Sequence, residues 1–160
     1  MLGIKLICVG KMREKHYIDA FAEYVKRLGA YCRFELLELP EVKLPDAPSS
    51  GEVSRALERE AKEILKNIPD GSHVIAMCVE GRNMSSEELA EYVERTVSGG
   101  VSRLVFLVGG SYGLADEVKQ RAKLRLSMSK MTFPHHLARV MLAEQIYRSF
   151  KIGEGSRYHK

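Results

Sequence analysis

The stretch LVFLVGGSYG, Leu104–Gly113, decides the fold. Its first five residues are all apolar, which predicts a strand buried on both faces, as in parallel sheets covered by helices. The glycines that follow, Gly109 and Gly110, predict a turn at the carboxyl end of this strand, where open α/β sheets bind their ligands. Glycine at this place lets the backbone approach a ligand and leaves its amides free to bind it. An ordinary tight turn between strand and helix is the alternative interpretation.

Predicted strands and helices alternate along the chain around this strand. Continuous apolar runs predict strands, and apolar residues spaced three and four apart predict helices. We expect strands at Gly3–Val9, Arg33–Leu39, His73–Val79 and Leu124–Ser127, and helices at about Ile18–Leu28, Gly51–Asn67, Ser85–Val97 and His135–Ile152. This order predicts one α/β domain over residues 1–160, a parallel sheet with helices on both faces. Pro40–Ser50 carries three prolines and is expected to be an exposed loop.

The overall composition excludes several classes of protein. The chain is 45% hydrophobic and 29% charged, which argues against a disordered protein. It has no apolar run of about 18 residues, and Met1–Gly10 is too short for a signal peptide, so we expect a cytoplasmic protein with no membrane partner. The formal net charge of +4 permits a phosphate-rich partner without requiring one.

The cysteines and histidines do not indicate a metal site. Cys8, Cys32 and Cys78 are odd in number, widely spaced and embedded in apolar runs, so buried free thiols are favoured over a disulfide or metal ligands. The five histidines show no ligand spacing of the kind that zinc sites use. We therefore predict that the protein binds no metal.

A second candidate ligand segment is Met128–Phe133, which lies directly before the last helix. Its mixture of small, polar and apolar residues suits a loop that lines a cofactor through backbone groups. An ordinary helix-entry loop is the alternative. The glycine turn after Val108 matches neither GxxxxGK[ST] nor GxGxxG, which argues against a nucleoside triphosphate or a dinucleotide as the ligand.

The last helix, His135–Ile152, is apolar around most of its circumference. A helix of this kind must be covered on more than one side, which predicts a homodimer formed through it. Glu144 and Arg148 lie four residues apart and therefore share one face of this helix. Either they form a buried ion pair at the dimer interface, or Arg148 reaches a nucleic-acid phosphate or base.

The C-terminal tail combines an aromatic ring, an imidazole and two cations in Arg157, Tyr158, His159 and Lys160. Tyrosine can stack on a splayed base, and arginine and lysine neutralise phosphate. Histidine titrates near neutral pH and can accept a proton in catalysis. The alternative is a frayed terminus without a function.

Taken together, the ordered motifs of the chain resemble the RlmH family, bacterial SPOUT-superfamily methyltransferases of large-subunit ribosomal RNA. The resemblance covers essentially the full length, and its specificity lies in the set rather than in any one motif. The motifs are Gly109-Gly110-Ser111-x-Gly113, Leu126-Ser127-x-Ser129-x-Met131-Thr132-Phe133-Pro134-His135, Arg139-Val140, Glu144-Gln145-x-Tyr147-Arg148 and Tyr158-His159-Lys160.

The resemblance implies more than the residue patterns do. It implies a C-terminal trefoil knot, a two-fold dimer and S-adenosylmethionine as the methyl donor. It also implies a substrate, namely N3 of a pseudouridine in the helix 69 stem-loop of 23S rRNA, methylated on assembled ribosomes. Periodicity gives no sign of the knot, which runs against ordinary topology.

The resemblance also implies site residues. The donor is expected at Met77, at Gly109 and along the second loop at Met128, Ser129, Lys130, Met131, Thr132 and Phe133. The implied catalytic residues are Glu144, Arg148, Tyr158 and His159, and the RNA contacts are Arg148, Arg157, Tyr158 and Lys160.

The imide N3–H must lose its proton before or during methyl transfer, so the site needs a base. We assign His159 as base or proton relay, with Tyr158 positioning the nucleobase. Arg148 and Lys160 hold phosphates or developing negative charge. Glu144 orients Arg148, although direct proton abstraction by Glu144 is a second possibility. The tail of one subunit is expected to serve the cofactor pocket of the other.

Two other functions compete with this interpretation. One is a SPOUT-type methyltransferase that acts on transfer RNA. The other is a ribosome-binding protein that keeps the fold without catalysis. A dehydrogenase is disfavoured because the first strand is not followed by the glycine fingerprint of a dinucleotide site.

Overall fold

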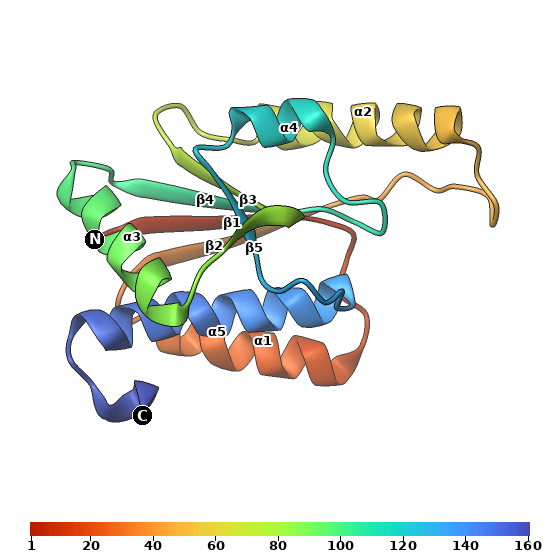
Figure 1. Ribbon diagram of the computed structural model, residues 1–160. Coiled ribbons are helices and arrows are strands. Elements are labelled where there is room, and N and C mark those ends of the chain that lie inside the picture. Colours follow the sequence, from red (N-terminus) through yellow and green to blue (C-terminus); the bar gives the residue numbers. More distant parts are fainter.

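Five parallel strands form one sheet in the order β2-β1-β4-β3-β5 (Figure 1), in a computed structural model that describes residues 1–160. The strands are β1 (Gly3–Val9), β2 (Arg33–Leu39), β3 (His73–Asn83), β4 (Arg103–Val108) and β5 (Leu124–Ser127). The helices are α1 (Lys15–Leu28), α2 (Ser50–Lys66), α3 (Ser86–Ser98), α4 (Asp116–Arg121) and α5 (His135–Gly153), followed by a 3-10 turn at Arg157–His159. The predicted α/β class is therefore confirmed.

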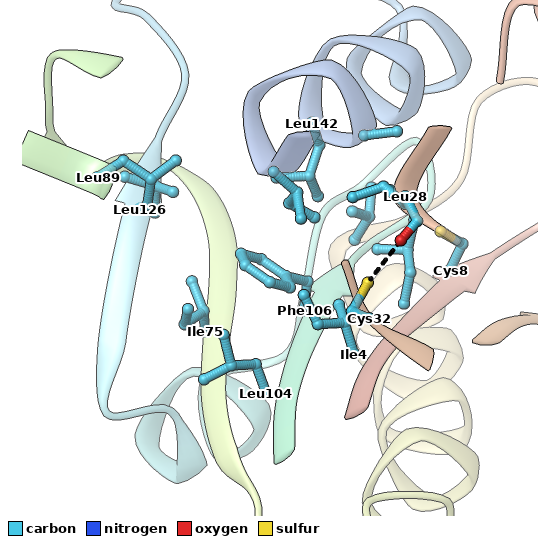
Figure 2. Close-up of a cluster of buried hydrophobic side chains, with 14 of the residues drawn as sticks. Ile4, Cys8, Leu28, Cys32, Ile75, Leu89, Leu104, Phe106, Leu126 and Leu142 are labelled. Atoms are coloured by element: carbon cyan, nitrogen blue, oxygen red, sulfur yellow. Dashed lines mark hydrogen bonds between the residues drawn. The ribbon is translucent and has the colours of Figure 1, made fainter. Parts of the chain in front are cut away.

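Helices cover both faces of the sheet, with α1, α3 and α5 on one side and α2 and α4 on the other (Figure 1). Alternate residues of the strands supply the two cores, because successive side chains of a strand point to opposite faces. Phe106 of β4 and Ile4 of β1 lie with Leu142 of α5 in the core beneath α1 and α5 (Figure 2). Val105 and Ile7 face the core beneath α2.

Local sequence signals explain where two of the helices begin. Ser85 accepts a hydrogen bond from the Glu88 amide at 3.1 Å, and the Glu88 side chain accepts from the Ser85 amide at 2.7 Å. This reciprocal capping box satisfies two amides that the first turn of a helix otherwise leaves free. Ser49 and Glu52 form a second capping box at the start of α2. At α5 the helix begins directly after Pro134, which lies at the N-cap.

Strand β3 extends beyond Val79, where the sequence predicted its end, and runs to Asn83. It pairs with β5 up to Met77, shifts register, and pairs again at Arg82 and Asn83. Its second half leaves the core, which explains why the apolar pattern stops before the strand does. At Gly81 the two backbones cross so closely that a Cβ atom would lie 2.8 Å from the carbonyl carbon of Arg125.

All three cysteines are free thiols, with Cys8 and Cys32 buried and Cys78 half-buried. Cys32 precedes β2 rather than lying inside a strand, and its thiol contacts the Leu28 carbonyl oxygen at 3.6 Å (Figure 2). None of the helices has the length and apolar character needed to cross a membrane. No cluster of three or more histidine, cysteine or carboxylate side chains has an arrangement suited to a metal ion.

Candidate active site

The two ligand-binding segments predicted from the sequence meet at the carboxyl end of the sheet. They line a common cavity of about 600 Å³. The lining includes seven of the predicted donor residues: Met77, Gly109, Met128, Ser129, Met131, Thr132 and Phe133. Lys130 lies in the same loop, but its side chain is exposed and does not line the cavity. A cavity of this size suits a ligand of cofactor dimensions.

The glycine turn after β4 is closed on itself. Gly113 donates its amide to the Gly110 carbonyl oxygen at 3.0 Å, and Gly113 has a φ of +77°, which favours glycine. A Cβ atom on Gly109 would lie 2.3 Å from the Gly113 carbonyl oxygen. The turn therefore depends on the absence of a side chain at Gly109, and all five of its residues line the cavity.

A carboxylate from a distant loop braces this turn. Glu41 accepts a hydrogen bond from the Ser111 amide at 3.0 Å, and a Cβ atom on Gly110 would lie 2.6 Å from the same oxygen. The next residue, Val42, donates its amide to Glu60 of α2 at 2.9 Å. The beginning of the Pro40–Ser50 segment, which we predicted to be simply an exposed loop, thus supports the cavity. No pattern in the sequence marks Glu41 for this position.

The second loop is shaped by short serine hydrogen bonds. Ser127 donates its hydroxyl to the Ser129 carbonyl oxygen at 2.9 Å, and Ser129 accepts from the Met131 amide at 3.0 Å. Serine side chains that bond their own backbone in this way stabilise turns. These hydrogen bonds therefore stabilise the conformation of the loop, which has no regular secondary structure. Met131 at its tip is 73% exposed.

A buried arginine attaches α5 to the carboxyl end of β1. Arg139 is 0% exposed and donates to the carbonyl oxygens of Val9 and Gly10, each at 2.8 Å, and to Glu38 at 3.0 Å. Glu38 also accepts the Met12 amide at 2.7 Å. The cavity-lining residue Ala138 directly precedes Arg139, so this network fixes one wall of the cavity. No pattern in the sequence indicates this role for Arg139.

The predicted catalytic residues form a second cluster on the outer side of α5. Glu144 accepts hydrogen bonds from the Nε of Arg148 at 2.9 Å and from the Tyr158 hydroxyl at 3.1 Å. The guanidinium carbon of Arg148 lies 4.8 Å from the centre of the Tyr158 ring. The structure thus brings together an acid, a cation and an aromatic ring from α5 and the C-terminal turn.

His159 lies between Arg148 and α3. Its Nδ1 is 3.2 Å from Arg148 Nη1, and its Nε2 is 2.6 Å from Glu87 Oε1. Because arginine can only donate, Nδ1 must accept, and Nε2 then carries the proton donated to Glu87. The hydrogen bond from His159 lowers the pKa of the Glu87 carboxyl. In this arrangement His159 holds the C-terminal tail against the protein.

Tyr158 has a pKa above its ordinary value. Burial is the main cause, and the negative charge of Glu144 adds to it because it disfavours a phenolate nearby. Tyr158 therefore stays protonated at neutral pH and acts as a hydrogen-bond donor. This excludes Tyr158 as the proton acceptor in this cluster and leaves it a positioning role.

Within one chain, the cavity and the catalytic cluster do not coincide. None of Glu144, Arg148, Tyr158 and His159 lines the donor cavity. Glu144 instead lines an adjoining groove of about 360 Å³, which shares Leu126, Ser127 and Met128 with the cavity. Arg157 and Lys160, the other predicted RNA contacts, are exposed at the tail.

Comparisons with known proteins define the class first. Residues 2–159 match the family model described as a predicted SPOUT methyltransferase. A probable methylase family protein from Haemophilus influenzae has the same fold, with a TM-score of 0.57 and 18% identity over 100% of this chain and 72% of its own. The sheet with its cavity at the carboxyl end is therefore that of a SPOUT methyltransferase.

Similarity to curated proteins then narrows the class to one family. The chain is 46% identical to the ribosomal RNA large subunit methyltransferase H of Bacillus thuringiensis subsp. konkukian, over 99% of this chain and 100% of that protein. It is 47% identical, with the same coverage, to methyltransferase H 1 of Clostridium perfringens. The chain belongs to the RlmH family of methyltransferases, as the sequence motifs predicted.

Proposed function

We propose that this protein is one methyltransferase domain, residues 1–160, that methylates N3 of a pseudouridine in helix 69 of 23S rRNA. The proposal places the reaction on assembled ribosomes in the cytoplasm, with S-adenosylmethionine as the donor. The observation that carries it is the pairing of two sites: a cavity built from two backbone turns, and a hydrogen-bonded cluster of acid, base and cation beside it. The curated relatives bear the name of ribosomal RNA methyltransferases.

The donor cavity suits S-adenosylmethionine, which SPOUT methyltransferases generally use. The Gly109–Gly113 turn lines the cavity, and it can close on itself because Gly109 has no Cβ to meet the Gly113 carbonyl. Met77 and Phe133 offer apolar surface, and the Met128–Phe133 loop offers backbone groups. These residues hold and orient the donor, which supplies an electrophilic methyl group. Aligning that group with the acceptor is the principal demand of such a transfer.

The catalytic cluster supplies the proton acceptor in this proposal. When Arg148 turns toward an RNA phosphate, Nδ1 of His159 loses its hydrogen-bond donor and becomes free to accept the N3 proton. Glu87 accepts the Nε2 proton of His159 and orients the ring. Glu144 holds both Arg148 and Tyr158, and so sets the positions of the cation and of the aromatic ring. Lys160 and Arg157 contribute positive charge at the tail.

A homodimer reconciles the two separate sites. Half-buried apolar residues on α5, such as Val140 and Met141, border the groove beside Glu144 and offer a surface for a second subunit. We infer that the catalytic cluster of one subunit faces the donor cavity of its partner. The C-terminal trefoil knot belongs to the same proposal and follows from the match to the SPOUT methyltransferase family.

The test is methyl transfer from labelled S-adenosylmethionine to bacterial ribosomes, free large subunits, naked 23S rRNA and transfer RNA. We expect label on assembled ribosomes, at one pseudouridine, and none on transfer RNA. The variant His159→Ala should lose transfer while keeping its affinity for the donor by calorimetry. Mixing a Gly109→Val subunit with a His159→Ala subunit should restore activity if the sites are shared. Label on transfer RNA alone, or donor binding without transfer to any RNA, would overturn the proposal.

A further inference from the structure

An uninterrupted run of positive charge surrounds the edge strand β5. Between Val118 and Ala143 there is no aspartate or glutamate, while there are six lysines and arginines: Lys119, Arg121, Lys123, Arg125, Lys130 and Arg139. The formal charge of this segment, +6, exceeds the +4 of the whole chain. The rest of the molecule therefore carries a net negative charge, and the first five of these cations, Lys119 to Lys130, belong to α4, to β5 and to the segments that flank β5.

Most of these cations are free for a partner. Arg139 is buried and paired with Glu38, and Lys119 is paired with Glu80. The remaining four are exposed and make no salt bridge, and exposed Arg82 of β3 joins them because it is in register with Leu126 of β5. We call Arg82, Arg121, Lys123, Arg125 and Lys130 the β5 strip.

The strip follows the edge of the sheet toward the donor cavity. At one end, Lys123 lies near His73 at the start of β3 and lowers the pKa of that histidine, after the larger effect of burial. Arg125 lies next along the strand, near enough to Glu80 to add to the lowering of the Glu80 pKa, which Lys119 dominates. Lys130, at the other end, belongs to the loop that lines the cavity.

These cations could instead have a purely structural role, which is to protect the edge of the sheet. Charged side chains on an edge strand prevent it from pairing with a strand of another chain. The opposite edge strand, β2, allows a comparison. Its solvent-exposed positions include Arg33 and Glu35, and Lys5 of β1 pairs with Glu35. At the β2 edge, charges of both signs are therefore enough to prevent pairing with another chain. A uniform positive sign at β5 goes beyond what protection of an edge requires.

We propose that the β5 strip binds the phosphate backbone of ribosomal RNA and guides the substrate to the donor cavity. Side chains two residues apart on a strand lie about 7 Å apart, a spacing comparable with that of neighbouring phosphates. Arg125 of β5 and Lys123, which directly precedes the strand, are two residues apart in this way. A positive track of this kind binds the backbone without reading bases. The proposal rests on the proposed function only for the choice of ribosomal RNA as the partner.

The experiment compares two triple variants with equal loss of charge. Arg121→Gln/Lys123→Gln/Arg125→Gln removes three cations of the strip, and Arg55→Gln/Arg59→Gln/Lys62→Gln removes three exposed cations of α2 on another surface. Binding to bacterial ribosomes and to naked 23S rRNA is measured by sedimentation or filter retention. The salt concentration is varied from about 50 to about 200 mM, because affinity that depends on phosphate contacts falls steeply over this range. Donor affinity is measured by calorimetry.

We expect the strip variant to bind ribosomes and 23S rRNA at least tenfold more weakly at low salt, with a logarithmic salt slope reduced by about two. Donor affinity and the α2 variant should be unchanged. Should the strip variant fold poorly, Arg82→Gln, on a different strand, should reduce the slope by roughly one. This binding assay needs no methyl transfer, so it remains decisive even where the methylation test fails.

Three results would overturn the inference. Equal affinity and slope in the two triple variants would remove the strip from RNA binding. Aggregation of the strip variant, with unchanged affinity of its monomeric fraction, would assign these cations to edge protection alone. Weaker binding to ribosomes with unchanged binding to naked 23S rRNA would point to an acidic ribosomal protein as the partner of the strip.

Discussion

Replacing Arg139 with methionine should destabilise the fold more than any exposed substitution in the chain. The change removes a fully buried guanidinium that donates to two backbone carbonyls and to Glu38. Methionine fills the path of the arginine stem, so the loss arises from unpaired polar groups rather than from a cavity. Breaking one partner of a buried ion pair typically costs about 3–5 kcal/mol.

For Arg139→Met we expect a loss of stability at the lower end of that range. Glu38 keeps its hydrogen bond from the Met12 amide, and its side chain is 24% exposed, so water relieves part of the unpaired charge. The carbonyls of Val9 and Gly10 have no such relief, and each buried unpaired acceptor costs about 1–3 kcal/mol. We therefore expect a loss of about 3 kcal/mol. For a domain of this size that corresponds to a fall in Tm of roughly 6–12 °C.

Urea unfolding followed by circular dichroism at one fixed protein concentration measures this loss, as a lower midpoint with an unchanged slope. Arg59→Met, on an exposed position of α2, is the control and should stay within about 0.5 kcal/mol of the parent. The double variant Arg139→Met/Glu38→Leu should recover part of the loss, because no buried charge is left unpaired. A loss below about 1 kcal/mol, or a double variant no more stable than the single one, would refute the reasoning.

Three further predictions follow from close contacts and burial. Gly109→Ala should weaken donor binding at least tenfold with the fold retained, because the added Cβ meets the Gly113 carbonyl at 2.3 Å; calorimetry showing unchanged affinity would contradict this. Gly81→Ala should lower the midpoint of urea unfolding by forcing β3 away from β5, whereas Gly71→Ala, which has open space but a φ of +74°, tests backbone strain alone. Burial raises the pKa of all three cysteines, to about 12 for Cys8 and to about 11 for Cys32. Because only Cys78 is partly accessible, alkylation should modify Cys78 first, and more slowly once donor is bound. Mass spectrometry that finds Cys8 modified as early as Cys78 would show that the core opens locally.

Prediction from the sequence succeeded where the signal was local. The bounds of β1, β2 and β5 agree with the apolar runs to the residue, and the Ser85 capping box marks the start of α3. Prediction failed where a strand continues without apolar residues, as β3 does beyond Val79, because periodicity reports burial rather than hydrogen bonding between strands. It failed as well in treating Pro40–Ser50 as a loop without a role in the site.

The residues of the site show the same distinction between local patterns and long-range contacts. Residues of the two turns and of the α5 face could be singled out from the chain, since glycines, a helix-entry loop and an i, i+4 pair are local patterns. The contacts of Glu41 with Ser111 and of Arg139 with Glu38 could not, because they join positions 70 and 101 residues apart.

Without any structure, the residues predict the class of the sheet, the family and most of the helices and strands. The periodicity of apolar residues indicates which side of each helix or strand is buried, and the turn residues indicate where each element ends. Only the tertiary structure decided which turns share a cavity, where the tail is held and which cations remain unpaired. Those outcomes depend on the order of the strands in the sheet, and that order arises from packing between distant segments that no local pattern records.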